Sequence, residues 1–146
     1  MKSIFKHFAI LSAVISLMSF VTANSVASER EEKVIYHISD SINASNALRN
    51  ARNHLAQSPK AKIVFVTHGM GIDFLIDGAA DKDGNPYDIA VQELAARRVE
   101  FRVCNNTLMG RNIDRSKLLS EASIVPSGVA EVARLQVQEN FAYIKP

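Results

Sequence analysis

The feature that most constrains the fold is a regular alternation of short β-branched or aromatic runs with stretches of helical periodicity. Five such runs occur, at residues 33–38, 62–67, 99–103, 123–125 and 142–144. The second run is apolar almost throughout, which is typical of a parallel sheet whose strands are buried on both faces. The third alternates, and Glu100 and Arg102 lie on the face opposite its apolar residues. These patterns predict five strands.

The segments between the runs predict helices. After the first run, four apolar residues recur at helical spacing up to Ser58-Pro59: Ala47, Leu48, Ala51 and Leu55. Further helices are expected over 72–76, from Tyr87 onward, over 114–121 and from Val129 onward. Strands that alternate with helices predict an α/β fold with right-handed crossovers, in which helices cover both faces of a parallel sheet.

The first 27 residues have the pattern of a secretory signal peptide. Lys2 and Lys6 precede an uncharged, mostly apolar run, and Ser25-Val26-Ala27 fits a small-residue cleavage site. The run is short for a bilayer, which needs roughly 20 apolar residues; an uncleaved N-terminal anchor is the alternative. We expect cleavage to leave one domain, residues 28–146, in the periplasm without stable membrane insertion.

Charge and cysteine content narrow the classes of partner and cofactor. The chain has 17 Lys and Arg and 15 Asp and Glu. Two of the lysines lie in the signal segment, so the mature chain is neutral and gives no reason to expect a nucleic-acid partner. Cys104 is the only cysteine, so no internal disulfide can form. No His/Cys cluster has the spacing of metal ligands, and neither a metal nor another cofactor is expected.

Three segments and the C-terminal end resemble the DsrE/DsrF-like family. They are Val64-Phe65-Val66-Thr67-His68-Gly69, Glu100-Phe101-Arg102-Val103-Cys104-Asn105-Asn106-Thr107-Leu108, Ile124-Val125-Pro126-Ser127-Gly128-Val129-Ala130-Glu131 and Phe141-Ala142-Tyr143-Ile144-Lys145-Pro146. The resemblance implies a three-layer α/β/α sandwich with a five-stranded, mainly parallel sheet wound like that of flavodoxin. It also implies self-association into a trimer or hexamer. Some members of the family carry sulfur as a persulfide, and by similarity Cys104 lies in the region of their cysteine.

The residues around Cys104 suggest how such a thiol would work. Ligands of wound sheets bind beyond the carboxyl ends of the strands, where Cys104 and His68 both fall. A thiolate is favoured by nearby cations and by a helix N-terminus. Arg102 and Arg111 are the candidate cations, and the expected helix cap is Asn105, Asn106 and Thr107.

Several interpretations stay open at this stage. The leading one is a sulfur carrier or sulfurtransferase-like protein, with Cys104 and His68 as its catalytic residues and donor and acceptor proteins as its partners. Whether it is an enzyme is left undecided. The second is a non-catalytic, oligomeric binding module with a structural cysteine, and the third is a Cys–His hydrolase, which needs a nucleophile–base contact of about 2.6–3.2 Å. Gly69-Met70-Gly71 is a weak nucleotide motif, and no role is assigned to His37 or His54.

Overall fold

The computed structural model describes residues 31–146, so the predicted signal segment lies outside the described residues. Five parallel strands form one sheet in the order β4-β3-β2-β1-β5. They are β1 (Lys33–Ile38), β2 (Lys62–Thr67), β3 (Glu100–Cys104), β4 (Ala122–Val125) and β5 (Ala142–Ile144). The prediction of a five-stranded parallel sheet is confirmed.

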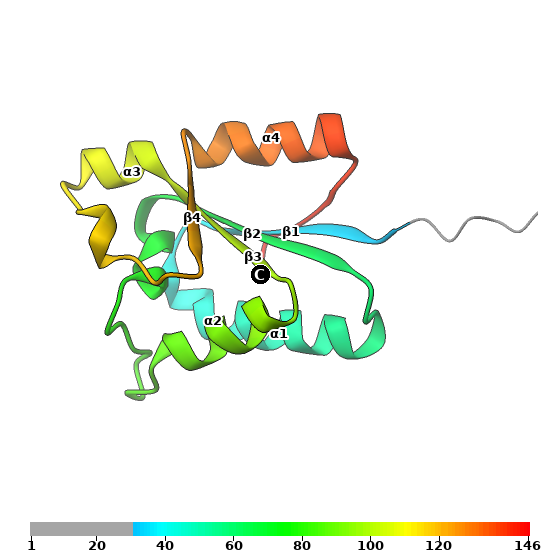
Figure 1. Ribbon diagram of the computed structural model, residues 1–146, viewed down its shortest axis with the longest axis horizontal. Helices are drawn as coiled ribbons and strands as arrows, with labels where there is room; N and C mark the ends of the chain where they lie inside the picture. The colour runs from blue at the N-terminus through cyan, green and yellow to red at the C-terminus, as the bar shows by residue number, and fades with distance from the viewer. Residues whose placement is uncertain (1–30) are drawn as a thin grey trace, which may run out of the picture.

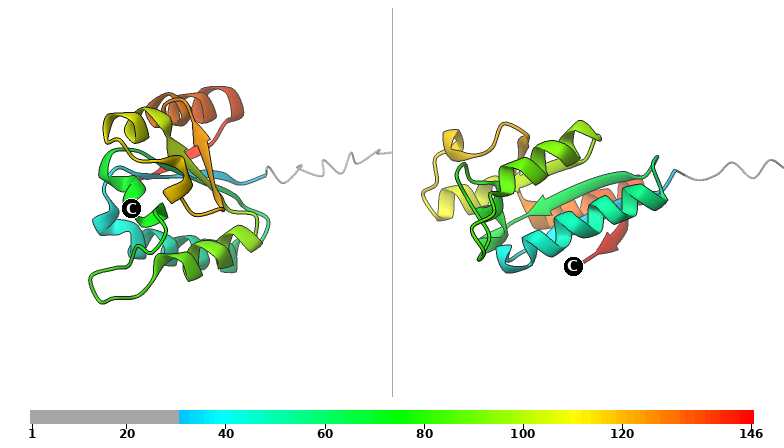
Figure 2. Two further views of the ribbon diagram at one scale, coloured as in Figure 1. Left: turned by 60° about the vertical axis from the view of Figure 1, so that its left-hand side comes forward. Right: turned by 90° about the horizontal axis from the view of Figure 1, so that it is seen from below.

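Helices cover both faces of the sheet. They are α1 (Ala44–Gln57), α2 (Tyr87–Ala96), α3 (Asn105–Gly110) and α4 (Gly128–Glu139), with 3₁₀ helices η1 (Ser41–Asn43), η2 (Gly69–Leu75) and η3 (Arg115–Lys117). Helices α1 and α2 lie on one face of the sheet, and α3 and α4 lie on the other (Figures 1 and 2). The chain steps from β1 to β4 across the sheet, and α4 then returns it to β5 beside β1. No helix of the described residues has the length and apolarity that a membrane span requires.

Local sequence explains where most elements begin and end. Asp40 accepts a hydrogen bond from the N–H of Ile42 and caps η1, and Ser127 accepts one from Ala130 and caps α4. Asn140 adopts the left-handed conformation that ends α4. The helix expected over 114–121 is wrong: only the turn of η3 forms there, because the helical segment begins at once after β3, as α3.

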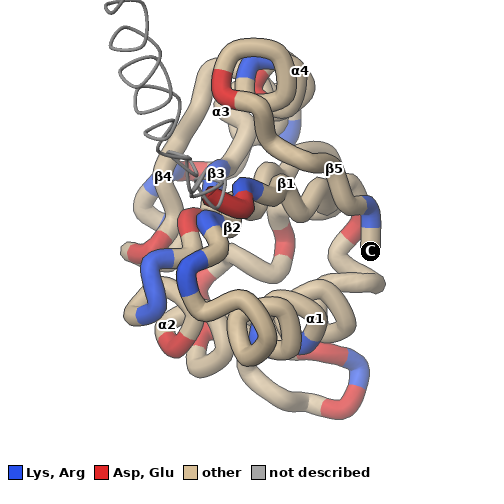
Figure 3. Tube along the Cα trace, turned by 90° about the vertical axis from the view of Figure 1, so that its right-hand side faces the viewer, with Lys and Arg blue, Asp and Glu red and all other residues tan. Residues whose placement is uncertain are grey.

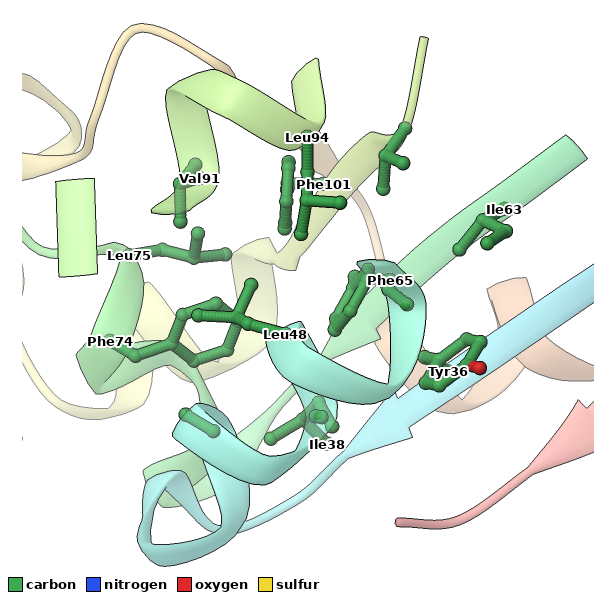
Figure 4. Packing of buried hydrophobic residues seen from close by; sticks show 14 of the residues in the cluster. Tyr36, Ile38, Leu48, Ile63, Phe65, Phe74, Leu75, Val91, Leu94 and Phe101 are labelled. Carbon is green, nitrogen blue, oxygen red and sulfur yellow. The ribbon is translucent and has the colours of Figure 1, made fainter. Parts of the chain in front are cut away.

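The face under α1 and α2 holds the main core. Twenty buried residues pack there, and the aromatic ring of Phe65 stacks on Tyr36 and Phe101 at centroid distances of 5.2 and 5.0 Å. Phe74 meets Phe65 and Phe101 edge-on (Figure 4). Interlocked aromatic rings of this kind dominate core energetics, so this face is the principal source of stability.

The face under α4 is more thinly packed. Its apolar cluster has six residues, namely Ile35, Val64, Val66, Val132, Leu135 and Phe141. Beside it lies an ion network in which Glu131, almost fully buried, accepts hydrogen bonds from Arg102 and Arg134. Arg102 also donates to Glu100 at 3.2 Å. Polar and charged side chains therefore occupy positions on this face that an apolar core would otherwise use.

Candidate functional site

The strand register brings Cys104 and His68 to the same point of the sheet. Val66 pairs with Arg102 and Thr67 with Val103, so His68 comes level with Cys104 where the two strands end. Strands β2 and β3 are neighbours in the sheet. Both residues are on the face that α4 covers, since side chains two apart on a strand share a face.

A glycine at the start of α4 allows the two side chains to come together. A β-carbon built on Gly128 would stand 3.2 Å from the β-carbons of both Cys104 and His68, and 3.0 Å from the carbonyl oxygen of Thr67. Any larger side chain at position 128 would collide with these atoms. Gly128 is therefore needed for the close approach of α4 to the ends of β2 and β3, a role that sequence reasoning missed.

The sulfur of Cys104 sits among hydrogen-bond donors from two helices. Cys104 is the residue before α3, so the first backbone N–H groups of this helix, those of Asn106 and Thr107, lie near its side chain. The hydroxyl of Thr107 and the N–H of Gly128, at the start of α4, add two further donors. Burial of the thiol raises its pKa, but these hydrogen bonds outweigh it and hold the pKa of Cys104 below its usual value. The site thus favours a thiolate by neutral dipoles.

The two arginines expected to act on the thiol are engaged elsewhere. Arg111 donates to Asp73 at 2.6 Å and to the carbonyl oxygen of Gly69 at 3.0 Å. Arg102 is held by Glu100 and Glu131. Neither guanidinium is among the groups that lower the pKa of Cys104. The sequence analysis expected cations to stabilise the Cys104 thiolate. Backbone N–H groups and a hydroxyl do so instead.

The three residues of the segment Asn105-Asn106-Thr107 make different contacts. Asn105 accepts a hydrogen bond from Arg115 at 2.7 Å. The Asn106 N–H donates a hydrogen bond to the carbonyl oxygen of Pro126 at 3.3 Å, and it also helps to lower the pKa of Cys104. The Thr107 hydroxyl also accepts from the N–H of Gly69 at 3.0 Å, which ties α3 to the loop after β2. Asn106 and Thr107 thus contact the thiol, whereas the side chain of Asn105 is bound to Arg115.

Two further polar residues, His37 and Tyr143, lie beyond His68 toward the edge of the sheet. Together with Cys104 and His68 they form a row of side chains. His37 of β1 lies with its ring centroid 4.8 Å from that of His68, and its Nδ1 is 2.7 Å from the hydroxyl of Tyr143 in β5. Burial lowers the pKa of both histidines, and the charge of Lys145 lowers it further. His37 and Tyr143 had no assigned role from the sequence. The available signal was a histidine at an interior strand position, where an aliphatic residue is usual.

Other expectations concern glycines and metals. Gly71 gives close backbone packing, since a β-carbon there would stand 2.1 Å from the carbonyl oxygen of Ile38, and Gly69 has a φ of 59°. The Gly69-Met70-Gly71 motif therefore shapes a tight turn. Within residues 31–146, no three His, Cys, Asp or Glu side chains gather in a way that could hold a metal ion.

Fold and site together define an α/β protein with a polarised thiol at the carboxyl end of a parallel sheet. The model of the DsrE/DsrF-like family matches residues 32–146, and the chain belongs to this family. A solved structure of a protein of unknown function, MTH1491 from Methanobacterium thermoautotrophicum, is similar at a TM-score of 0.70 and 30% identity. The match covers 80% of this chain and 100% of that one.

A second solved structure, the ychN protein from E. coli, is similar in fold at a TM-score of 0.62 and 15% identity, covering 79% of this chain and 97% of that one. The comparison with curated proteins gave no match. The DsrE-like resemblance inferred from the sequence is confirmed, and it places the chain in a family related to sulfur relay.

Proposed function

We propose that this protein is a sulfur carrier that holds sulfur as a persulfide on Cys104 and passes it to the thiol of a partner protein. The observation that carries the proposal is the position of Cys104 at the carboxyl end of β3, directly before α3 and beside Gly128 at the start of α4. Hydrogen bonding from Gly128, Thr107 and Asn106 lowers the pKa of the thiol there. Family membership supports the same chemistry. A buried cysteine with a structural role alone would be an inert, apolar filler and would need none of these donors.

The transfer step follows from thiol–disulfide chemistry. An acceptor thiolate attacks the terminal sulfur of the persulfide, a new S–S bond forms on the acceptor, and the bond to Cys104 breaks. The electron pair of that bond leaves on the Cys104 sulfur as a thiolate. A thiol of low pKa leaves faster, so the hydrogen bonds that stabilise the Cys104 anion also speed release of its cargo.

The arrangement is unlike that of a Cys–His hydrolase. In the described residues no hydrogen bond joins His68 to Cys104, although the two side chains are neighbours. Burial lowers the pKa of His68, which disfavours the imidazolium that a Cys–His ion pair contains. His68 is a neutral group beside the thiol under this proposal.

One observation favours the second candidate function, an oligomeric binding module with a structural cysteine. Cys104 is only 5% exposed. The two functions differ in one property: a carrier thiol reacts in the folded protein, whereas a structural thiol reacts only after unfolding. The reactivity of Cys104 therefore decides between them.

We further propose that the protein acts in the periplasm and as a homo-oligomer of three or six chains. Export rests on the signal-like first 27 residues. Self-association is supported by large apolar side chains exposed on the described surface, among them Val137, Ile89 and Val129. Full-length protein in the cytosolic fraction would contradict export, and a monomer by light scattering over a wide concentration range would contradict assembly.

The test of the carrier function is the mass of Cys104 in protein isolated from its own compartment and in protein treated with a persulfide donor. We expect the mass of one added sulfur on Cys104, removed by a thiol reductant, and its transfer to an acceptor thiol. Cys104→Ser should fold normally and carry none. An unmodified thiol that takes up no sulfur in the folded wild type would refute the carrier function.

A further inference from the structure

Helix α4 meets strand β3 at two points on the face of the sheet that it covers. Arg102 and Cys104 are two residues apart in β3, so their side chains lie on the same face. A β-carbon built on Gly128, at the start of α4, would stand 3.2 Å from that of Cys104. Three residues further along the helix, Glu131 accepts a hydrogen bond from Arg102. The charged contact therefore lies next to the thiol site on both the strand and the helix.

The contact between Arg102 and Glu131 is largely shielded from water and has its own supporting bonds. The exposed fractions of the two side chains are 15% and 10%. Glu131 also accepts hydrogen bonds from Arg134 at 2.9 and 2.8 Å. Arg102 also donates to Glu100 at 3.2 Å. The carboxylate and the guanidinium are thus both held in fixed orientations, and the pair joins β3 directly to α4.

Apolar packing holds α4 over a different part of the sheet. The apolar cluster beneath the helix takes its strand residues from β1 and β2, namely Ile35, Val64 and Val66. In the described part of the chain β3 adds none to this cluster, because its residues on this face are Glu100, Arg102 and Cys104. Among the side chains of β3, the charged pair is therefore the one that ties the first turn of α4 to the strand.

A buried ion pair is a poor choice if stability is the only need. The desolvation of two charges offsets much of their attraction, and an apolar pair of similar volume is often as stable or more stable. A charged pair does fix one register between two elements, because only one arrangement brings the donor to the acceptor. In this protein that register decides how close Gly128 comes to Cys104.

We propose that Arg102 and Glu131 are positioning residues, whose ion pair holds the first turn of α4 against the end of β3 and so keeps the Gly128 N–H beside the Cys104 sulfur. They act on the thiol through the position of the helix and not through their own charges. The inference rests on the carrier function proposed above, since it concerns how the Cys104 thiolate is stabilised. The bond from the Gly128 N–H is one of those that lower the pKa of Cys104.

The test is the pH profile of Cys104 alkylation by iodoacetamide in the folded Glu131→Ala variant, because the two ways in which Glu131 could act predict opposite signs. Removal of a negative charge would by itself favour the thiolate, lower its apparent pKa and speed the reaction. Loss of the ion pair should instead let the Gly128 N–H move away, raise the apparent pKa and slow alkylation at about pH 7 roughly threefold to tenfold. Glu131→Gln can still accept a hydrogen bond from Arg102, so it should raise the pKa by less, and it keeps the test valid if Glu131→Ala does not fold.

Two variants of the same helix are matched controls. Glu139→Ala removes an acid that is bonded to Arg134 at the far end of α4. Leu135→Ala loosens the apolar packing of α4 and leaves the charged pair in place. Both should keep the wild-type apparent pKa of Cys104, although Leu135→Ala should lower the free energy of unfolding.

The outcomes separate this inference from the carrier function. If the wild type reacts but both Glu131 variants have its apparent pKa or a lower one, the positioning role is wrong and the carrier function stands. An equal rise in Leu135→Ala would assign the effect to a general loosening of α4, and it would also overturn the positioning role. If the folded wild type resists iodoacetamide, the carrier function itself fails.

Discussion

The two faces of the sheet differ in what they bury. The face under α1 and α2 encloses twenty buried residues and a stack of aromatic rings, whereas the face under α4 encloses six apolar residues, an ion network and the thiol site. Successive residues of β1 show the division, since Tyr36 joins the aromatic stack and His37 joins the row beside Cys104. One face holds the protein together, which leaves the other free to carry polar groups.

The charged residues are distributed differently from the buried apolar residues. Basic and acidic residues of the described chain lie interspersed along its trace (Figure 3). No single-signed field is therefore available to set the chemistry of the site. Local hydrogen bonds and individual charges, such as Lys145, must do so.

The largest expected effect tests the stabilising role of the α1/α2 face. Phe65→Ala removes the central ring of the stack, and it should lower the free energy of unfolding by about 4 kcal/mol. Leu135→Ala, on the thin face, should cost about 2 kcal/mol because fewer neighbours are lost. Urea unfolding of both variants measures the difference. Equal losses would mean that the two faces stabilise the fold alike.

The ion network on the thin face should make stability depend on pH. Hydrogen bonds from Arg134 and Arg102 hold the pKa of Glu131 below its usual value, against the opposing effect of burial. A lowered carboxyl pKa stabilises the folded state above the unfolded pKa, and this stabilisation is lost as the pH falls through the folded pKa. Glu131→Gln should cost about 2 kcal/mol near neutral pH and should flatten the acid limb of the profile of unfolding free energy against pH. An unchanged acid limb in this variant would rule out the network as its source.

The junction at Gly128 connects stability with reactivity. Gly128→Ala should destabilise the protein by about 1–3 kcal/mol, because its β-carbon would crowd the Thr67 carbonyl, Cys104 and His68. It should also slow alkylation of Cys104, since the Gly128 N–H would move away from the sulfur. Gly110→Ala is the matched control: nothing lies within 4 Å of a β-carbon there. If Gly128→Ala behaves as Gly110→Ala does, the close approach of α4 is not needed.

A smaller effect is expected from the hydroxyl beside the thiol. Thr107→Val removes a hydrogen bond that lowers the pKa of Cys104, so that pKa should rise. Alkylation at about pH 7 should slow roughly threefold to tenfold, in line with the smaller thiolate fraction. Thr107→Ser keeps a hydroxyl and should react like wild type. A normal rate in Thr107→Val would remove this residue from the site.

The sequence predicted the dense face better than the thin one. Parallel strands, helix α1 and the alternation of Glu100 and Arg102 in β3 follow from hydrophobic periodicity, because burial on a regular element leaves a periodic pattern. The sequence also predicted that Cys104 and His68 lie close together, because the carboxyl ends of neighbouring parallel strands lie at the same edge of the sheet.

What could not be predicted depends on how distant segments meet. Arg102 pairs with its strand neighbour Glu100, which the sequence could have suggested, but its other partner, Glu131, comes from α4. The partner of Arg111, Asp73, comes from η2, so no local pattern shows that this charge is engaged. The role of Gly128 depends on how closely α4 approaches the ends of β2 and β3, and that of His37 on the pairing of β5 with β1. Short-range reasoning also gave the Asp114–Glu121 segment a helix, although the helical turns belong to α3, next to the thiol.

The central claim is that Cys104 is a thiolate stabilised by the donors around it and accessible to reaction. Its most direct test is the rate of alkylation by iodoacetamide in the folded and the urea-unfolded protein, measured as a function of pH. The account predicts that the folded protein reacts, with an apparent pKa below that of the unfolded chain. A folded protein that resists alkylation until it unfolds, or an apparent pKa above that of the unfolded chain, would contradict it.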